Sequence, residues 1–148
     1  MRRGAACGTL AGMASKQEIS AFIAREFPQT RVQVLEAGDM SATVAHEVGP
    51  NELRPGGTVS GPVMMATADV ALYVAILGEI GIVPLTVTTS LSFNFMRKPS
   101  ADRRIIGVCR LMKLGRTLAV GEVSLYSEGL SDPVAHAVGT YAIPPRKT

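Results

Sequence analysis

The most apolar stretch of the chain, residues 64–77, has one charged residue, Asp69, near its middle. Its apolar residues lie on every side of a helix with 3.6 residues per turn, which predicts a helix that other elements cover on all faces. Burying an unpaired carboxylate costs several kcal/mol unless it is hydrogen-bonded or protonated. Asp69 is therefore the residue in this helix that most needs an explanation.

Residues that favour helix termini mark both ends of this helix. Ser60 is a natural N-cap, and Pro62 suits the first turn, where its missing N–H leaves no helix hydrogen bond unmade. The helix is expected to begin at Gly61 or Pro62, and Gly78 and Gly81 predict its end at about residue 77.

One shorter helix is predicted near the start of the chain. Ser15 and Glu18 have the spacing of a capping box, and apolar residues at helical spacing follow until Pro28 ends the pattern. The preceding residues, 1–12, are expected to be a disordered extension, and residues 13–148 are expected to form a single domain.

Alternation of apolar and polar residues predicts six strands. It is clearest over residues 85–96, where it places Leu91, Phe93 and Phe95 on one face and Thr88 and Ser90 on the other. The other strands are expected at residues 31–37, 41–48, 103–112, 117–127 and 133–143, with a loop over residues 49–57.

The order of these elements predicts an α+β fold. Strands joined by short turns favour an antiparallel sheet. Because the long helix is apolar all round, we expect one curved sheet to wrap it and a partner subunit to close the open side.

Composition narrows the class of protein. Apolar residues make up 47% of the chain and charged residues 18%, which is typical of a globular protein. The net charge of +3 comes from basic residues at the two ends, so the composition argues against a general nucleic-acid binder. Residues 70–77 are too few to span a bilayer. Cys7 and Cys109 form neither a disulfide framework nor a metal-binding spacing, which fits a reducing cytoplasm.

Two interpretations of Asp69 stay open at this level. No cation lies three or four positions away on the helix, so no local salt bridge explains it. It is either a structural residue bonded to a backbone group or to a hydroxyl of a partner subunit, or a general base or nucleophile. Gly61 likewise has two interpretations. It is part of an ordinary capped helix start, or its backbone amide forms a binding site for an oxyanion.

Two further groups of polar residues have weaker signals. The basic residues between Arg97 and Arg116 are either a solvated rim of turn residues or a phosphate-binding surface. His46 and His136 lie in strand patterns without a partner at metal-ligand spacing, which favours structural strand residues.

Three blocks of sequence resemble one known family. The blocks are GGTVSGPVMMATADVAL, TTSLSFNFMRKP and LMKLGRTLAVGEVSLYS, and PVAHAVGTYAI follows as a closing strand. Over roughly residues 15–144 the chain resembles hotdog-fold acyl-CoA thioesterases of the phenylacetate-pathway type, in the 4-hydroxybenzoyl-CoA thioesterase-like superfamily. The resemblance implies a long central helix wrapped by a curved antiparallel sheet, in a homodimer that often forms a dimer of dimers.

The resemblance also implies roles for particular residues. Asp69 stands at the position of the catalytic acid, the Gly61 amide at the group that polarises the thioester carbonyl, and Thr88 at a hydroxyl that helps place the attacking water. The chain departs from the family at Ser60, which replaces a His, and at Arg54, which replaces an Asn. Pro62 likewise replaces a Gly. Arg54 could clamp a carboxylate or phosphate, or pair with Asp69.

The implied activity is hydrolysis of an acyl-CoA to a free acid and coenzyme A, without a metal or other cofactor. The acyl pocket would be lined by Met64, Met65, Tyr73 and residues of the partner subunit. An acyl-CoA-binding protein without turnover is the alternative, and a dehydratase or hydratase is less favoured because neither His lies near the central helix in sequence. The coenzyme A phosphates would bind Arg97, Lys98, Lys113 and Arg116.

Overall fold

A computed structural model describes residues 13–145, so the extension expected at residues 1–12 lies outside the described part of the chain. The first helix, α2, spans Lys16–Glu26. Its capping box is present as predicted: the Glu18 amide donates to Ser15 Oγ at 3.1 Å, and the Ser15 amide donates to the Glu18 carboxylate at 2.8 Å. The helix ends just before Pro28.

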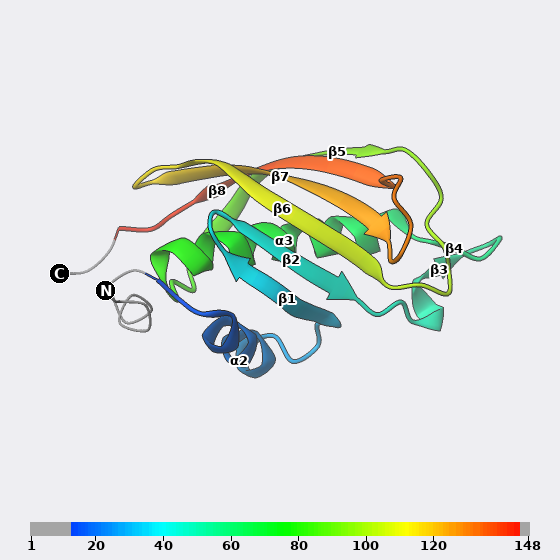
Figure 1. Cartoon of the computed structure of the whole chain (residues 1–148), viewed down its shortest axis with the longest axis horizontal. Helices are drawn as coiled ribbons and strands as arrows, with labels where there is room; N and C mark the ends of the chain where they lie inside the picture. Colours follow the sequence, from blue (N-terminus) through cyan, green and yellow to red (C-terminus); the bar gives the residue numbers. More distant parts are fainter. Residues whose placement is uncertain (1–12, 146–148) are drawn as a thin grey trace.

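A six-stranded antiparallel sheet forms the body of the molecule (Figure 1). Its order, β1-β2-β6-β7-β8-β5, places the strand that follows the long helix at one edge. This is the hotdog arrangement that the resemblance implies. The strands are β1 Val32–Gly38, β2 Ser41–His46, β5 Val87–Phe95, β6 Ile105–Leu114, β7 Leu118–Ser127 and β8 Ala135–Ala142.

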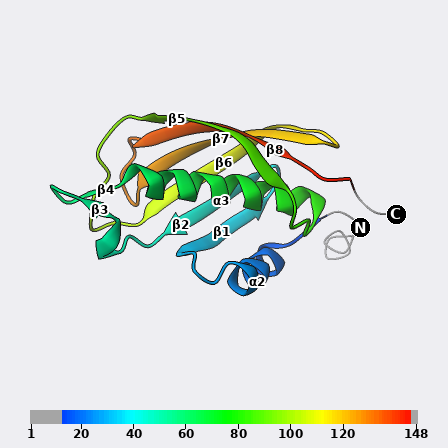
Figure 2. The same cartoon turned by 180° about the vertical axis from the view of Figure 1, so that it is seen from behind.

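The long helix α3, Gly61–Ile80, lies across one face of the sheet, as the two opposite views show (Figures 1 and 2). The predicted end at about residue 77 is wrong, because the helix continues through Gly78 to Ile80. Glycine inside a helix costs only about 1 kcal/mol relative to alanine, and burial of the flanking residues outweighs that cost. Gly81, with a φ of +90°, ends the helix instead.

By length and composition α3 is also a candidate membrane span, with a mean hydropathy of 1.7 over 18 residues. The prediction that this stretch is too short to span a bilayer is wrong, because it counted only residues 70–77 and the helix is longer. Residues 71–78 are all buried inside the fold, and more than half of the apolar window is buried. In this structure α3 is a core helix that packs against the sheet.

The segment before α3 is more ordered than the loop predicted over residues 49–57. A single 3-10 turn, η1 Pro50–Glu52, leads into a short hairpin made by β3 Leu53–Arg54 and β4 Thr58–Val59. The Ser60 amide donates to the Glu52 carbonyl at 2.9 Å. The start of α3 is therefore anchored to η1 by a backbone hydrogen bond.

Strand β5 departs from the strict alternation that its sequence predicts. Thr88 pairs with Tyr141 of β8 and Ser90 pairs with Thr140, so Thr89 is an extra residue in the ladder. Such a β-bulge reverses the face on which the following side chains lie. Thr88 therefore faces α3, on the same side as Leu91, rather than the outer face on which Ser90 lies.

One side of the molecule leaves apolar residues uncovered. Strand β5 has a free edge, and the side chains of Val87 and Phe95 are each 51% exposed. On α3, Met65 is 40% exposed, so the sheet of this chain does not cover the helix on all faces. An apolar edge strand beside an open helix face is typical of a surface that another chain covers.

Candidate active site

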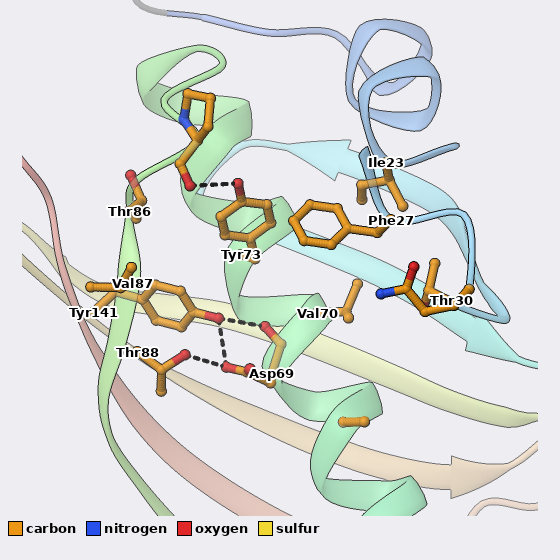
Figure 3. A pocket seen from close by; sticks show the side chains of 13 residues that line it. Ile23, Phe27, Thr30, Asp69, Val70, Tyr73, Thr86, Val87, Thr88 and Tyr141 are labelled. Atoms are coloured by element: carbon orange, nitrogen blue, oxygen red, sulfur yellow. Dashed lines mark hydrogen bonds between the residues drawn. The ribbon is translucent and has the colours of Figure 1, made fainter. Parts of the chain in front are cut away.

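Asp69 lies on the open side of α3, half-buried in the wall of a pocket of about 630 Å³ (Figure 3). This is the side of the helix that a partner subunit is expected to close. Because the pocket is open, the carboxylate keeps contact with solvent and avoids the full cost of burial. The same opening gives a ligand access to it.

Two hydroxyl groups hold one oxygen of this carboxylate. Thr88 Oγ1 donates to Asp69 Oδ1 at 2.7 Å, and Tyr141 Oη lies 2.5 Å from the same atom. Tyr141 Oη also lies 2.9 Å from the Asp69 backbone carbonyl. Within residues 13–145, no group donates to Oδ2, which leaves that oxygen able to accept a proton or to attack.

Tyr141 was not among the residues proposed from the sequence. Its only sequence signal is an inward position in the alternation of β8, which most buried strand residues share. The ring is 3% exposed. Burial, together with the negative charge of Asp69, raises the pKa of the Tyr141 phenol, so the hydroxyl stays protonated and acts as a donor.

The rest of the pocket is mainly apolar and aromatic. Tyr73 of α3 packs edge to face against Phe27, the residue that follows α2, with ring centroids 6.0 Å apart. The Tyr73 hydroxyl donates to the Pro84 carbonyl at 3.1 Å, and burial raises the pKa of this phenol. Helix α2 therefore supplies a wall of the pocket that sequence reasoning did not propose. The residues that line the pocket include Ile23, Phe27, Thr30, Val70, Tyr73 and Tyr141.

The start of α3 has backbone donors without partners. Ser60 occupies the N-cap position as predicted, but its side chain makes no capping hydrogen bond. Within the described residues, the amides of Gly61 and Val63 also have no acceptor, and Pro62 between them has no N–H. Unpaired amides at a helix start attract negative charge. Phe95 packs against this corner, since a Cβ added at Gly61 would lie 3.3 Å from Phe95 Cζ.

Asp69 and Gly61 are too far apart to act on one thioester within a single chain. Asp69 is eight positions after Gly61 along α3, and a rise of about 1.5 Å per residue puts them roughly 12 Å apart. The bond to be cleaved needs both a nucleophile and an oxyanion donor within about 3 Å of the reacting atoms.

Three other residues proposed from the sequence lie outside the group of side chains that holds Asp69. Arg54 is exposed on the β3–β4 hairpin and forms no ion pair with Asp69 of the same chain. Met64 is 4% exposed and packs in the core, so within this chain it does not line the pocket. Met65 is exposed beside the open face of α3.

The proposed basic residues are all exposed, but they form two separate pairs. Arg97 and Lys98 follow the end of β5, where Arg97 donates to the Pro133 carbonyl at 3.2 Å. Lys113 and Arg116 flank the β6–β7 turn. The strand order places that turn at the opposite end of the sheet. One chain alone does not gather these four charges.

The two histidines are structural strand residues, as the sequence favoured. His46 Nε2 lies 2.9 Å from both carboxylate oxygens of Glu52, and His136 Nε2 lies 3.0 Å from Glu122. Burial raises the pKa of the Cys109 thiol to about 12, which makes it unreactive. No group of three or more His, Cys, Asp or Glu side chains in residues 13–145 is placed to hold a metal ion.

Comparison with known proteins gives a consistent picture. Residues 56–133 match the thioesterase superfamily. A structure from Silicibacter sp. TM1040, described as that of a candidate thioesterase, is 46% identical, with 88% of this chain and 92% of that chain covered and a TM-score of 0.81. A comparison with curated proteins found no match.

Two more distant structures share the fold. Mutant phenylacetic acid degradation protein PaaI from Thermus thermophilus is 27% identical, with 84% of this chain and 99% of that chain covered and a TM-score of 0.68. A hypothetical thioesterase from Streptococcus pneumoniae, solved with coenzyme A, is 17% identical. It covers 79% of this chain and 88% of its own, with a TM-score of 0.68. At that identity the likeness concerns the fold alone.

Proposed function

Because this chain belongs to the thioesterase superfamily and is a thioester hydrolase, we propose that it hydrolyses an acyl-CoA thioester to a free acid and coenzyme A, with Asp69 as the reacting carboxylate. The observation that carries this proposal is the state of Asp69 in the pocket. Its Oδ1 is held by two hydroxyl donors, while Oδ2 has no donor from the described residues. No metal or other cofactor is needed for this chemistry.

In the proposed reaction, Asp69 Oδ2 takes a proton from water as the water oxygen attacks the thioester carbonyl carbon. The carbonyl electrons move to an oxyanion, and the C–S bond breaks when this intermediate collapses. The thiolate of coenzyme A takes up the proton that Asp69 had accepted. Direct attack by Asp69 through an anhydride, followed by hydrolysis of the anhydride, is the alternative route to the same products.

The oxyanion donor in this proposal is the amide of Gly61 of the partner subunit. Thr88 and Phe95 lie near opposite ends of β5, beside Asp69 and Gly61 respectively. If two copies of β5 pair antiparallel through their free edges, Thr88 of one subunit comes close to the Phe95 end of the other. That pairing covers the exposed apolar edge and brings an unpaired helix-start amide toward Asp69.

The same pairing supports the proposed site for coenzyme A. The partner's Arg97 and Lys98 would come to the end of the sheet that bears Lys113 and Arg116, so that four basic residues could bind the phosphates. A hypothetical thioesterase that shares this fold, from Streptococcus pneumoniae, was solved with coenzyme A. We further propose that the enzyme acts in the cytoplasm, as a homodimer or a dimer of dimers, without a nucleic-acid partner.

A thiol-release assay with short, medium and aryl acyl-CoAs tests the activity. The parent protein is expected to release free coenzyme A from part of this panel, and Asp69→Asn is expected to lose that release while keeping its fold and oligomeric state. Unchanged turnover in Asp69→Asn would contradict the role of the carboxylate. Tight acyl-CoA binding without release in the parent protein would favour the binding-protein alternative, which the replacement of the family's His and Asn by Ser60 and Arg54 keeps open.

The shared site is tested with a matched pair of variants at Gly61. Gly61→Pro removes the amide hydrogen at a helix position that tolerates proline, whereas Gly61→Ala adds a Cβ against Phe95 and keeps the amide. We expect Gly61→Pro to lose on the order of 10²-fold more turnover than Gly61→Ala.

Co-expression of Asp69→Asn with Gly61→Pro under two affinity tags then locates the two groups. A heterodimer has one intact site if Asp69 and Gly61 come from different subunits, so a random mixture should recover about one quarter of the parent activity for a two-fold symmetric dimer. If both groups act within one chain, mixing restores nothing.

A further inference from the structure

We propose that Tyr141 is a positioning residue that fixes Asp69 through Oδ1 and thereby makes Oδ2 the reacting oxygen. This inference rests on the proposed function, because it assigns a role within the same site. Tyr141 contacts the carboxylate and the backbone carbonyl of Asp69, so its role is to orient that residue.

The first support is the geometry of the hydroxyl. Tyr141 Oη has one hydrogen and two acceptors within reach, Asp69 Oδ1 at 2.5 Å and the Asp69 carbonyl at 2.9 Å. A hydrogen bond from O–H to an ionised carboxylate is normally about 2.5–2.7 Å long and is roughly twice as strong as a neutral one. The shorter contact with Oδ1 is therefore the stronger of the two and restricts rotation of the carboxylate.

The second support is the rigidity of the donor. Tyr141 pairs with Thr88 of β5 on one side and with Ala119 of β7 on the other, so the sheet holds its backbone from both edges. Its ring is almost fully buried, and the Tyr73 ring lies 6.2 Å away between centroids. Thr88, in contrast, is exposed on the edge strand. The Tyr141 hydroxyl is thus the more rigid of the two donors to Asp69, and the Thr88 hydroxyl is the more adaptable one.

The third support is the β-bulge at Thr89. The bulge makes Thr88 the direct cross-strand neighbour of Tyr141 with both side chains facing α3. Figure 3 shows the two hydroxyls approaching Asp69 from this side. Two donors on one oxygen leave the other oxygen as the only site at which this carboxylate can accept a proton from water, which is the preorganisation that a reacting group requires.

Tyr141→Phe tests the inference because it removes the donor and keeps the ring. We expect kcat to fall on the order of 10- to 100-fold with little change in KM, because the carboxylate is no longer held in its reacting orientation. Thr88→Val should lower kcat by less, again with little change in KM, because Tyr141 still holds Oδ1.

Tyr126→Phe is the matched control. Tyr126 lies on β7 with its side chain on the outer face of the sheet, so the same hydroxyl is removed away from the pocket. It should leave both kcat and KM as in the parent protein. If Tyr141→Phe does not fold, 3-fluorotyrosine at position 141 replaces it. A more acidic phenol is a stronger donor, so kcat should then stay at or above the parent value with KM unchanged, and a fall in kcat would overturn the inference.

The outcomes separate this inference from the proposed function. An unchanged kcat in Tyr141→Phe, together with an inactive Asp69→Asn, would overturn the positioning role and leave the activity in place. A parent protein inactive on the whole acyl-CoA panel would instead remove the proposed function. The carbon-13 chemical shift of the Asp69 carboxyl at a fixed neutral pH, assigned by its loss in Asp69→Asn, then decides: the same chemical shift in Tyr141→Phe and parent would overturn the inference.

Discussion

Glu52 and Asp69 are two carboxylates that the fold treats in opposite ways. Both oxygens of Glu52 are engaged: His46 Nε2 lies 2.9 Å from each of them, and the Gly49 amide donates to Oε1 at 2.8 Å. Asp69 has donors at Oδ1 only, among the residues that the structure describes. Glu52 belongs to η1, in the segment that leads into α3, whereas Asp69 lies in the open wall of the pocket.

The difference shows how acceptor use distinguishes a structural carboxylate from a reacting one. Burial alone would raise the pKa of Glu52, but the Gly49 amide and the hydrogen bond and charge of His46 outweigh it, so the pKa lies below its usual value. The charged form of Glu52 is thus used to hold the chain together. Asp69 keeps one oxygen uncommitted, which contributes less to stability and leaves that oxygen available for chemistry.

The largest effects should separate the two carboxylates by function and by stability. Asp69→Asn is expected to lower turnover on the order of 10³-fold while changing the free energy of unfolding by less than about 1 kcal/mol. Glu52→Gln is expected to lower the free energy of unfolding by about 2 kcal/mol, because buried His46 loses a charged acceptor, and to keep most of its turnover. Thiol release measures turnover, and urea unfolding measures the free energy of unfolding. Similar effects of both variants on the free energy of unfolding would contradict this distinction between the two carboxylates.

An intermediate effect should appear in the pH dependence of stability. Because the folded-state pKa of Glu52 lies below the ordinary value of 4.5, its contribution is present above that pH and is lost as the pH falls through the lower folded value. The gap in unfolding free energy between the parent and Glu52→Gln should therefore narrow as the pH falls from 6 toward 3, roughly the range over which carboxylates titrate. A gap that stays constant over this range would show that Glu52 is not stabilising through its charge.

The smallest effect concerns Ser60, which joins the two regions through its backbone. Its amide is bonded to the Glu52 carbonyl, while its side chain caps nothing. Ser60→Ala should change the free energy of unfolding by less than about 0.5 kcal/mol. Ser15→Ala, which breaks the capping box of α2, should cost about 1 kcal/mol. Equal losses in thermal or urea unfolding would indicate that Ser60 caps α3 in solution.

Most of the fold could be predicted from local patterns. The capping box at Ser15, the clear alternation of the strands and the apolar length of α3 each reflect interactions within a few residues, and the structure confirms them. The errors fall where tertiary contacts outweigh local preference. Gly78 stays helical because its neighbours are buried. Residues 50–59 form a 3-10 turn and a hairpin that no periodicity in the sequence predicts.

The candidate site was only partly visible in the sequence. Asp69 could be found because a carboxylate in an apolar helix is unusual, and Gly61 because it stands at a helix start. Thr88 was found through the family resemblance. Tyr141 could not be found, because an inward tyrosine on a strand has the same pattern as any core residue. Ile23 of α2 and Phe27 just after it were likewise missed, because their helical spacing indicates packing and not which cavity they line.

By itself, the sequence determined that a long apolar helix carries one carboxylate and begins at an unusual Ser-Gly-Pro corner. Only the tertiary structure decided what surrounds that carboxylate. A single extra residue at Thr89 changes the face of a strand, and this is a property of the pairing between β5 and β8, since side-chain alternation restarts at a bulge. That pairing places Thr88 and Tyr141 on the same oxygen of Asp69, whereas strict alternation would have turned Thr88 away from it.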